Sequence, residues 1–175
     1  MRPLDSTGLK RLHREWRRRT SGRVALILDG VQQPYNVGAI LRTATAYRVE
    51  HLWLAGATAS PDAPGARKTA LGSNRFLTWS AVDTGHDGVV AAHDAGFLVV
   101  GIELADGAQP LHETELGDAV CLALSHEDHG LSRNCLEACD AVAYLPQVGR
   151  IGSLNVATAA AIALYETRRQ EWIRS

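Results

Sequence analysis

The sequence predicts an α/β fold in which one mostly parallel sheet is flanked by helices. Short, continuous apolar runs such as residues 24–28 (VALIL) fit strands that are buried on both faces of a parallel sheet. These runs alternate along the chain with longer segments of helical character, which is the order expected of an α/β domain. We see no internal repeat and no linker between domains.

The expected elements follow one another in that alternating order. A short basic helix is expected over residues 9–19, because Leu9, Leu12 and Trp16 are spaced to share one apolar face. Residues 59–65 contain two prolines and a glycine and are expected to form a mobile loop. The remaining helices are expected over residues 37–47, 85–95 and 153–172, and the strands over residues 24–28, 51–54, 76–80, 97–101, 119–124 and 141–144.

Length and composition suit one domain with a substantial core. The chain has 175 residues, of which 46% are hydrophobic. We expect a basic N-terminal helical extension over residues 1–22 and one compact domain over residues 23–175. No run approaches the roughly 20 apolar residues that a membrane span needs, and the N-terminus lacks the apolar stretch of a secretory signal. The three cysteines lack metal-site spacing, which predicts reduced thiols in a cytoplasmic protein.

The net charge of −1 conceals an uneven distribution. Eight of the 18 Lys and Arg residues lie within the first 23 positions, whereas none lies between Arg75 and Arg133, where ten Asp and Glu residues fall. Such a cluster either contacts a polyanion such as RNA or forms a solvated helix face, and the sequence leaves both open. The RNA-contact interpretation assigns that role to Lys10, Arg11, Arg14, Arg17, Arg18 and Arg19.

Three motifs contain residues suited to chemistry. Residues 36–43 (NVGAILRT) begin an expected helix, whose free amides favour anions, and Arg42 can bind a phosphate. Residues 122–132 (LALSHEDHGLS) run from an apolar strand into a loop. Residues 145–155 (LPQVGRIGSLN) lead through a glycine-rich turn to the last helix, where Ser153 and Asn155 are suited to capping its first turn.

Taken together and in this order, the three motifs resemble those of the SpoU/TrmH family of RNA ribose 2′-O-methyltransferases. The resemblance covers residues 23–171. It leans toward the tRNA guanosine branch through residues 67–74 (RKTALGSN), residues 164–170 (LYETRRQ) and the basic N-terminal helix. The family implies a C-terminal trefoil knot, a homodimer with each active site at the subunit boundary, and S-adenosyl-L-methionine as methyl donor without a metal.

The resemblance also implies which residues form the site. The implied catalytic residues are Asn36, Arg42, Glu127, Ser153 and Asn155. The implied donor-binding residues are Gly101, Ile102, Leu124, Ser125, Gly130, Leu145, Ile151 and Leu154. At position 125 the family usually has glycine, so the serine is expected to weaken donor binding at worst. An arginine with a pKa above about 12 is a poor base, so Arg42 is better suited to orienting the hydroxyl and stabilising the forming alkoxide.

Several alternatives accompany this interpretation. The expected acceptor is a guanosine in the tRNA D-loop. A ribosomal RNA acceptor, in a role such as antibiotic resistance, and a non-catalytic RNA-binding protein on the same scaffold are the alternatives. Residues 126–129 (HEDH) lack a third ligand for a metal, and adjacent residues cannot adopt the geometry of a hydrolase triad. No GxGxxG sequence follows the first strand, which argues against a Rossmann dinucleotide site.

Overall fold

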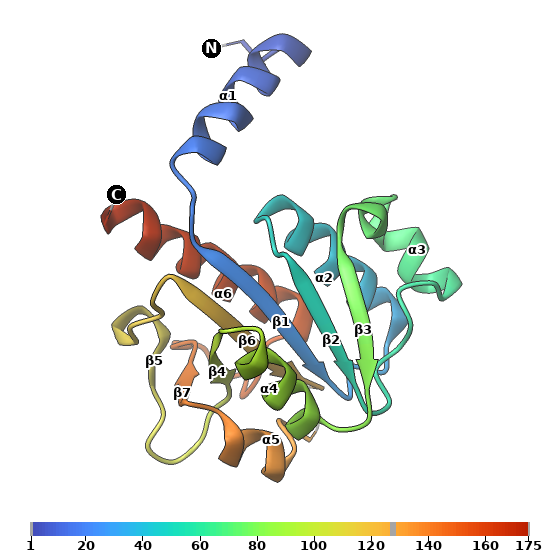
Figure 1. The fold of residues 1–175 in the computed structure, drawn as a ribbon, viewed down its shortest axis with the longest axis vertical. Coiled ribbons are helices and arrows are strands. Elements are labelled where there is room, and N and C mark those ends of the chain that lie inside the picture. Colours follow the sequence, from blue (N-terminus) through green and yellow to red (C-terminus); the bar gives the residue numbers. More distant parts are fainter. Residues whose placement is uncertain (1, 127–128, 175) are drawn as a thin grey trace.

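The computed structural model describes residues 2–126 and 129–174. Within these residues, seven strands form one parallel sheet in the order β3-β2-β1-β6-β4-β7-β5 (Figure 1). The strands are β1 (Arg23–Asp29), β2 (His51–Ala55), β3 (Thr78–Val82), β4 (Leu98–Ile102), β5 (Gln109–Pro110), β6 (Ala119–Ser125) and β7 (Ala141–Tyr144). The α/β fold with a parallel sheet is therefore confirmed.

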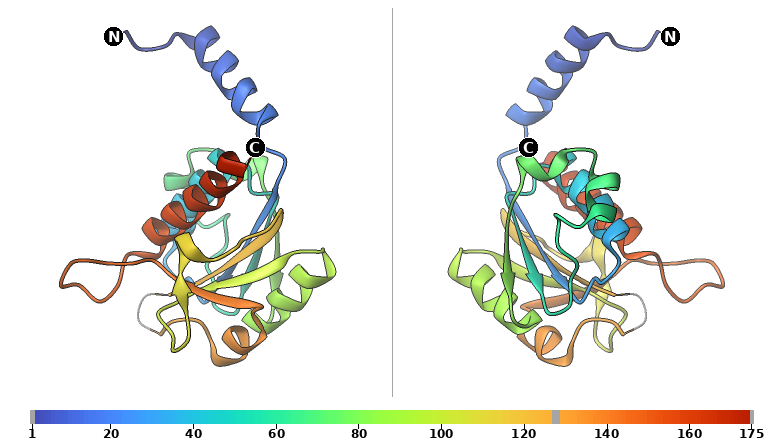
Figure 2. Two further views of the ribbon diagram at one scale, coloured as in Figure 1. Left: turned by 90° about the vertical axis from the view of Figure 1, so that its left-hand side faces the viewer. Right: turned by 90° about the vertical axis from the view of Figure 1, so that its right-hand side faces the viewer.

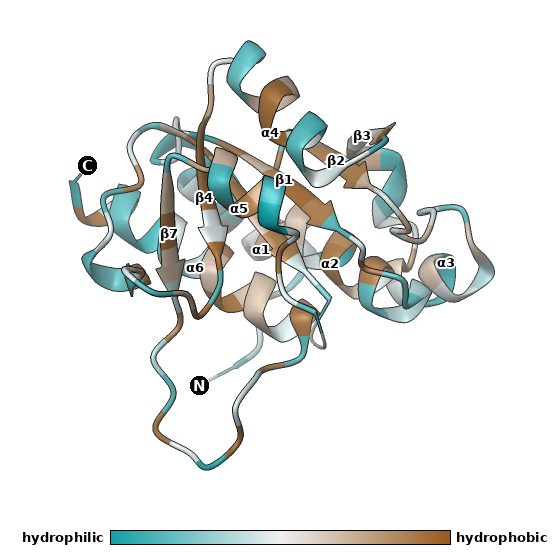
Figure 3. Ribbon diagram, turned by 90° about the horizontal axis from the view of Figure 1, so that it is seen from below, coloured by the Kyte–Doolittle hydropathy of each residue, from teal (hydrophilic) through white to brown (hydrophobic). Residues whose placement is uncertain are grey.

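Helices cover both faces of this sheet. The helices are α1 (Ser6–Arg18), α2 (Pro34–Ala46), α3 (Pro64–Ala70), α4 (Gly85–Asp94), α5 (Arg133–Ala138) and α6 (Val156–Arg174), with short 3₁₀ turns η1 (Ser73–Phe76) and η2 (Leu111–Glu113). Helices α2, α3 and α6 pack on one face, and α4 and α5 pack on the other (Figures 1 and 2). Figure 3 shows the apolar strands enclosed between these layers. No helix among the described residues is long and apolar enough to cross a membrane.

Several predicted boundaries need correction: α1 and α2 each begin three residues earlier than expected, and α5 was not expected. The strand expected from residue 76 begins at Thr78, because Ser73–Phe76 form the turn η1. The helix expected from Ser153 begins at Val156, because Asn155 accepts the amides of the first turn and so caps the helix. Pro64 starts helix α3 instead of continuing a loop, since proline is well tolerated in the first turn. The edge strand β5 was not predicted, because two residues carry no detectable alternation.

The loop that precedes α3, which we expected to be mobile, is hydrogen-bonded to the loop that follows β1. Pro61 is buried, and the amide of Ala59 donates a hydrogen bond of 2.9 Å to the carbonyl of Val31. Gly38 explains the close approach of α2 to the helix that follows this loop. A Cβ at position 38 would overlap Thr69 and the carbonyl of Ala66, so glycine permits this helix crossing.

A buried arginine joins segments that are far apart in sequence. Arg168 is 1% exposed and donates hydrogen bonds to the carbonyls of Tyr47 (2.9 Å), Gly22 (2.8 Å) and Arg48 (3.1 Å). It also pairs with Glu171 at 2.8 Å. These contacts connect the last turns of α6 to the end of α2 and to the start of β1.

Glu171 completes this polar cluster by accepting the amides of Ser21 (2.6 Å) and Gly22 (2.7 Å). Burial alone raises the pKa of Glu171, but these amides and the Arg168 guanidinium together bring it below its ordinary value. A carboxyl group with a lowered pKa stabilises the fold above its unfolded-state pKa. That stability is lost as the pH falls through the folded-state value.

The cluster leads to a prediction about stability. Arg168→Met is expected to lower the free energy of unfolding by roughly 3–5 kcal/mol, because it leaves Glu171 and three carbonyls without their buried partner. The neighbouring Arg169→Met is the matched control. Arg169 pairs with Glu166 at a partly exposed site, so its loss should lower the free energy of unfolding much less. Urea titration of both variants measures the difference, and equal losses would contradict the structural role of Arg168.

Candidate active site

A cavity lies at the carboxyl ends of three neighbouring strands, where open α/β sheets commonly bind ligands. Its walls are the ends of β4, β6 and β7, the loop over residues 145–155 and the first turn of α6. The loop projects away from the body of the protein (Figures 2 and 3). The cavity is lined by Ile102, Glu103, Leu104, Leu124, Ser125, His126, Gly130, Tyr144, Leu145, Gln147, Gly152, Ser153, Leu154, Val156 and Ala159.

Glu103 fixes the loop that follows β6 against the end of β4. Its carboxylate accepts the amides of Leu131 (2.9 Å) and Leu104 (3.0 Å). Gly130 has a positive φ of 65°, and a Cβ at that position would lie 2.6 Å from a Glu103 carboxylate oxygen. Two independent features therefore require glycine at position 130: the left-handed backbone conformation and the close approach of the carboxylate.

A second carboxylate holds the other end of the same loop. The amide and hydroxyl of Ser132 both donate to Asp29 Oδ2, at 3.0 and 2.6 Å. Asp29 ends β1, and its register partner on β6 is Ser125. The second sequence motif is thus tied to two strand ends, which presents its backbone toward the cavity.

Asn155 connects the first and third sequence motifs. Its side-chain oxygen accepts the amides of Ala157 (3.0 Å) and Thr158 (3.3 Å), and its side-chain nitrogen donates to Asn36 Oδ1 at 3.1 Å. Asn36 lies in the first turn of α2, so the amino-terminal ends of α2 and α6 meet at this amide pair. Ser153 is exposed and lines the cavity beside them.

Arg42 stands apart from the cavity within one chain. It is six residues beyond Asn36 on α2, which places its Cα roughly 9 Å farther along the helix axis. Its side chain is exposed, does not line the cavity and has no ion-pair partner among residues 2–126 and 129–174. As far as residues 2–126 and 129–174 show, the guanidinium is available for a phosphate or for a second subunit.

The structure gathers most of the expected donor-binding residues around the cavity. Those that line it are Ile102, Leu124, Ser125, Gly130, Leu145 and Leu154. Gly101 does not line the cavity. A side chain at this position would point toward Leu131 and Cys139, in the core beside α5. Ile151 is 78% exposed on the projecting loop. Glu127, expected in the catalytic set, lies outside the described residues.

Sequence reasoning did not single out Tyr144 and Gln147 as cavity residues. Tyr144 is the last residue of β7, and Gln147 lies three positions farther on. Their position was the only indication in the sequence, because both lie within two residues of Leu145 at the end of an expected strand. Glu103 was noticed only as part of the turn after β4, and its role in binding loop amides depends on the tertiary structure.

The chemistry of the cavity suits a ligand with both apolar and polar parts. Aliphatic side chains from three strand ends face it, together with Glu103, Ser153 and the glycine-rich loop. It encloses about 110 Å³ in this conformation, which is small beside the roughly 300–1,000 Å³ of pockets that bury drug-sized ligands. A ligand of that size therefore requires the projecting loop to move. No group of three or more metal-ligating side chains occurs among the described residues.

Comparisons with known proteins identify the family of this chain. The model of the SpoU rRNA Methylase family matches residues 23–165. A 23S rRNA (guanosine-2′-O-)-methyltransferase RlmB from Coxiella burnetii is 32% identical over 95% of this chain and 65% of its own length. A tRNA (guanosine(18)-2′-O)-methyltransferase from Escherichia coli is 29% identical over 84% of this chain and 63% of its own length.

A solved structure supports the same relationship. The SpoU methyltransferase AviRb from Streptomyces viridochromogenes, in complex with the cofactor AdoMet, superposes with a TM-score of 0.76 at 29% identity, over 86% of this chain and 58% of AviRb. The chain thus spans between 58% and 65% of the length of these three proteins.

Ser125 provides a direct test of the cavity. Ser125→Gly removes a Cβ from the cavity lining, so the affinity for S-adenosyl-L-methionine should stay the same or increase. Isothermal titration of the donor into both proteins measures this. A clear loss of affinity in the variant would show that the serine makes a favourable contact with the ligand.

Proposed function

The chain belongs to the SpoU rRNA methylase family, and we propose that it transfers the methyl group of S-adenosyl-L-methionine to a ribose 2′-hydroxyl of RNA. The observation that carries this proposal is the meeting of the second and third sequence motifs at one cavity, with the first motif bound to it through Asn36 and Asn155. A donor site and a nucleotide site would then adjoin at the carboxyl edge of the sheet.

The lining residues divide naturally between the two substrates. Ile102, Leu124 and Leu145 would contact the adenosyl part of the donor, and the backbone of the 145–155 loop would bind its polar groups. When bound, the donor supplies an electrophilic methyl group to the 2′-oxygen. The new bond is O–CH₃, the broken bond is S–CH₃, and the hydroxyl proton leaves to the surroundings.

The polar residues beside the donor would hold the nucleotide. Ser153 and the Asn36–Asn155 amide pair present hydrogen-bonding groups next to the cavity. Arg42 would bind the adjoining phosphate and stabilise the oxygen as it loses its proton, a role that suits a permanently charged group. We extend the same assignment to Glu127, as a residue that orients these side chains.

For the acceptor, we propose a guanosine in the D-loop of tRNA, with ribosomal RNA as the second candidate. The basic helix α1 supports a structured RNA of either kind. The named relatives act on both classes, so the acceptor needs a direct measurement. The three cysteines are free thiols, which fits our assignment to the reducing cytoplasm.

Arg42→Ala tests the proposed reaction. We expect the variant to lose methyl transfer while donor affinity stays unchanged, because Arg42 does not line the donor cavity. The measurement is transfer of a labelled methyl group to total tRNA and, separately, to ribosomal RNA. Arg133→Ala, an exposed arginine on α5, is the matched control and should retain activity.

The outcomes separate the candidates. Label on tRNA alone supports the tRNA assignment, and label on ribosomal RNA alone replaces it with the second candidate. Normal turnover by Arg42→Ala would remove that residue from the reaction. Absence of label on both RNAs would leave a non-catalytic RNA-binding protein on the same scaffold.

We further propose a homodimer with the trefoil knot of the family, in which α6 packs against a second subunit. Ile162 and Tyr165 on α6 are 44% and 50% exposed and lie one turn apart on the same face, with Ala161 beside them. A second subunit on this face would cover the exposed apolar surface of α6.

The dimer proposal predicts a change in mass. Ile162→Asp places a charge on the exposed face of α6 and should yield a monomer with lost methyl transfer. Val90→Asp is a matched control, because Val90 is 43% exposed on α4 at the opposite face of the sheet. Sedimentation equilibrium distinguishes them. A dimeric Ile162→Asp variant would locate the subunit contact elsewhere.

A further inference from the structure

A second cavity, of about 540 Å³, lies between α1 and the carboxyl-terminal ends of α2 and α6. We call it the α1 groove; its lining includes Trp16, Arg17, Tyr47, Arg48 and Trp172. Helix α1 itself has no buried residue and extends from the body of the protein (Figure 1). The groove therefore lies at the amino-terminal edge of the sheet, opposite the donor cavity.

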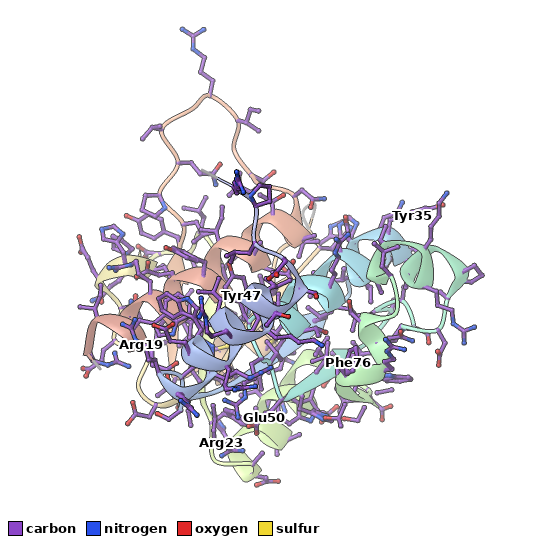
Figure 4. All side chains as sticks on the ribbon, turned by 90° about the horizontal axis from the view of Figure 1, so that it is seen from above. Arg19, Arg23, Tyr35, Tyr47, Glu50 and Phe76 are labelled. Atoms are coloured by element: carbon purple, nitrogen blue, oxygen red, sulfur yellow. The ribbon has the colours of Figure 1, made fainter. Side chains whose placement is uncertain are left out.

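Aromatic rings from three helices form a continuous series at this groove. The Trp16 and Trp172 rings are 4.7 Å apart, Trp172 and Tyr165 are 6.2 Å apart, and Tyr165 and Tyr47 are 6.3 Å apart. In the view from above, Tyr47 lies between the ribbons of α1 and α6 (Figure 4). Trp16 remains 38% exposed, so part of its ring is free to contact a ligand.

Hydrogen bonds through Thr20 connect the Trp172 ring to the backbone of Trp16. The indole nitrogen of Trp172 donates to the Thr20 hydroxyl at 2.9 Å, and that hydroxyl donates to the carbonyl of Trp16 at 2.7 Å. The guanidinium of Arg19 lies 4.7 Å above the Trp16 ring. The aromatic surface is thus formed before a ligand arrives, which lowers the entropy cost of binding.

The charges around the α1 groove are cationic. Its lining contains the exposed Arg17 and Arg48 and no Asp or Glu, while the Arg168 in the lining is buried and paired with Glu171. Further basic residues of the same helix extend this field: Lys10, Arg11, Arg14 and Arg18. A ligand that carries both flat aromatic groups and negative charges matches this lining, and a nucleotide within RNA has both.

The backbone at Arg48 has an unusual conformation. Arg48 follows the C-terminus of α2 with a φ of 57°, a position at which glycine is the usual residue. Its carbonyl accepts from Arg168, and its own guanidinium donates to the carbonyl of Thr20 at 3.1 Å. Arg48 therefore adopts an unfavourable backbone conformation at the edge of the α1 groove, where its guanidinium places a positive charge near the aromatic rings.

We propose that the α1 groove binds an unpaired nucleotide of a folded RNA, with its base on the Trp16 ring and its phosphates on Arg17 and Arg48. This inference rests on the proposed action on RNA and specifies the kind of RNA. Along α6, roughly 24 Å separates Val156 at the donor cavity from Trp172 at the α1 groove, so the bound nucleotide is distinct from the one that is methylated. The substrate must therefore be folded and must present two unpaired nucleotides that far apart.

The test uses two fluorescent RNA hairpins that differ only in one extrahelical adenosine in the stem. The wild-type protein should bind the bulged hairpin roughly tenfold more tightly than the fully paired one, because a base–aromatic stack has about that effect. Trp16→Leu should abolish this preference while keeping affinity for the paired stem. Trp79→Leu is the matched control, since Trp79 is 37% exposed on β3, and it should behave as wild type.

Arg48→Gly tests the rim without the risk of misfolding. Glycine suits the left-handed backbone, so the melting temperature should be maintained while affinity for both hairpins decreases. Equal affinity of the wild-type protein for both hairpins, or an unchanged preference in Trp16→Leu, would overturn the proposal. A lower mass of Trp16→Leu in sedimentation, with the preference intact, would assign the groove to a second copy of the chain and also overturn it.

Hairpin binding needs no methyl donor, so this test is independent of methyl transfer. A preference for the bulged hairpin without methyl transfer to any RNA would support the groove and remove the proposed reaction. Methyl transfer to tRNA or ribosomal RNA with no preference for the bulged hairpin would support the proposed reaction and overturn the nucleotide-binding role of the groove.

Discussion

The buried Arg168 guanidinium determines how the two ends of the chain are arranged around the sheet. It accounts for three backbone carbonyls and one carboxylate, and these belong to the start of β1, the end of α2 and the last turns of α6. A buried charge is stable only when it is paired and hydrogen-bonded throughout, so these segments cannot separate without a large cost. The position of α1, which follows from the chain entering β1, depends on the same contacts.

The opposite edge of the sheet is organised by carboxylates that bind backbone amides. Glu103 and Asp29, at or just beyond the ends of β4 and β1, hold the loop after β6 through Leu131 and Ser132. Because every strand is parallel, these ends face the same side and the loops meet there. The cavity is thus a consequence of sheet direction, and the glycine at position 130 allows the loop to lie close enough to be held.

The two edges suggest a division of labour within the proposed function. The carboxyl edge would carry the reaction, and the amino edge, with its aromatic series and basic helix, would recognise the fold of the RNA. Helix α6 contributes to both, since Val156 and Ala159 line the donor cavity and Trp172 lines the α1 groove. An RNA bound at both edges would be oriented by two contacts, which favours a rigid, folded acceptor over a short single strand.

The sequence by itself determined the parallel α/β sheet, six of its strands to within a residue or two at each end, and the three motifs, because apolar runs and capping residues are local signals. It also indicated seven of the fifteen residues that line the cavity, most of them at or near strand ends. Only the tertiary structure decided that Arg168 is a buried structural residue, although it adjoins the partly exposed Arg169 in sequence. It likewise decided that Gly101 faces the core and that Trp16, Tyr47 and Trp172 meet. Burial and contact between distant segments depend on how helices cross, which no local pattern of residues specifies.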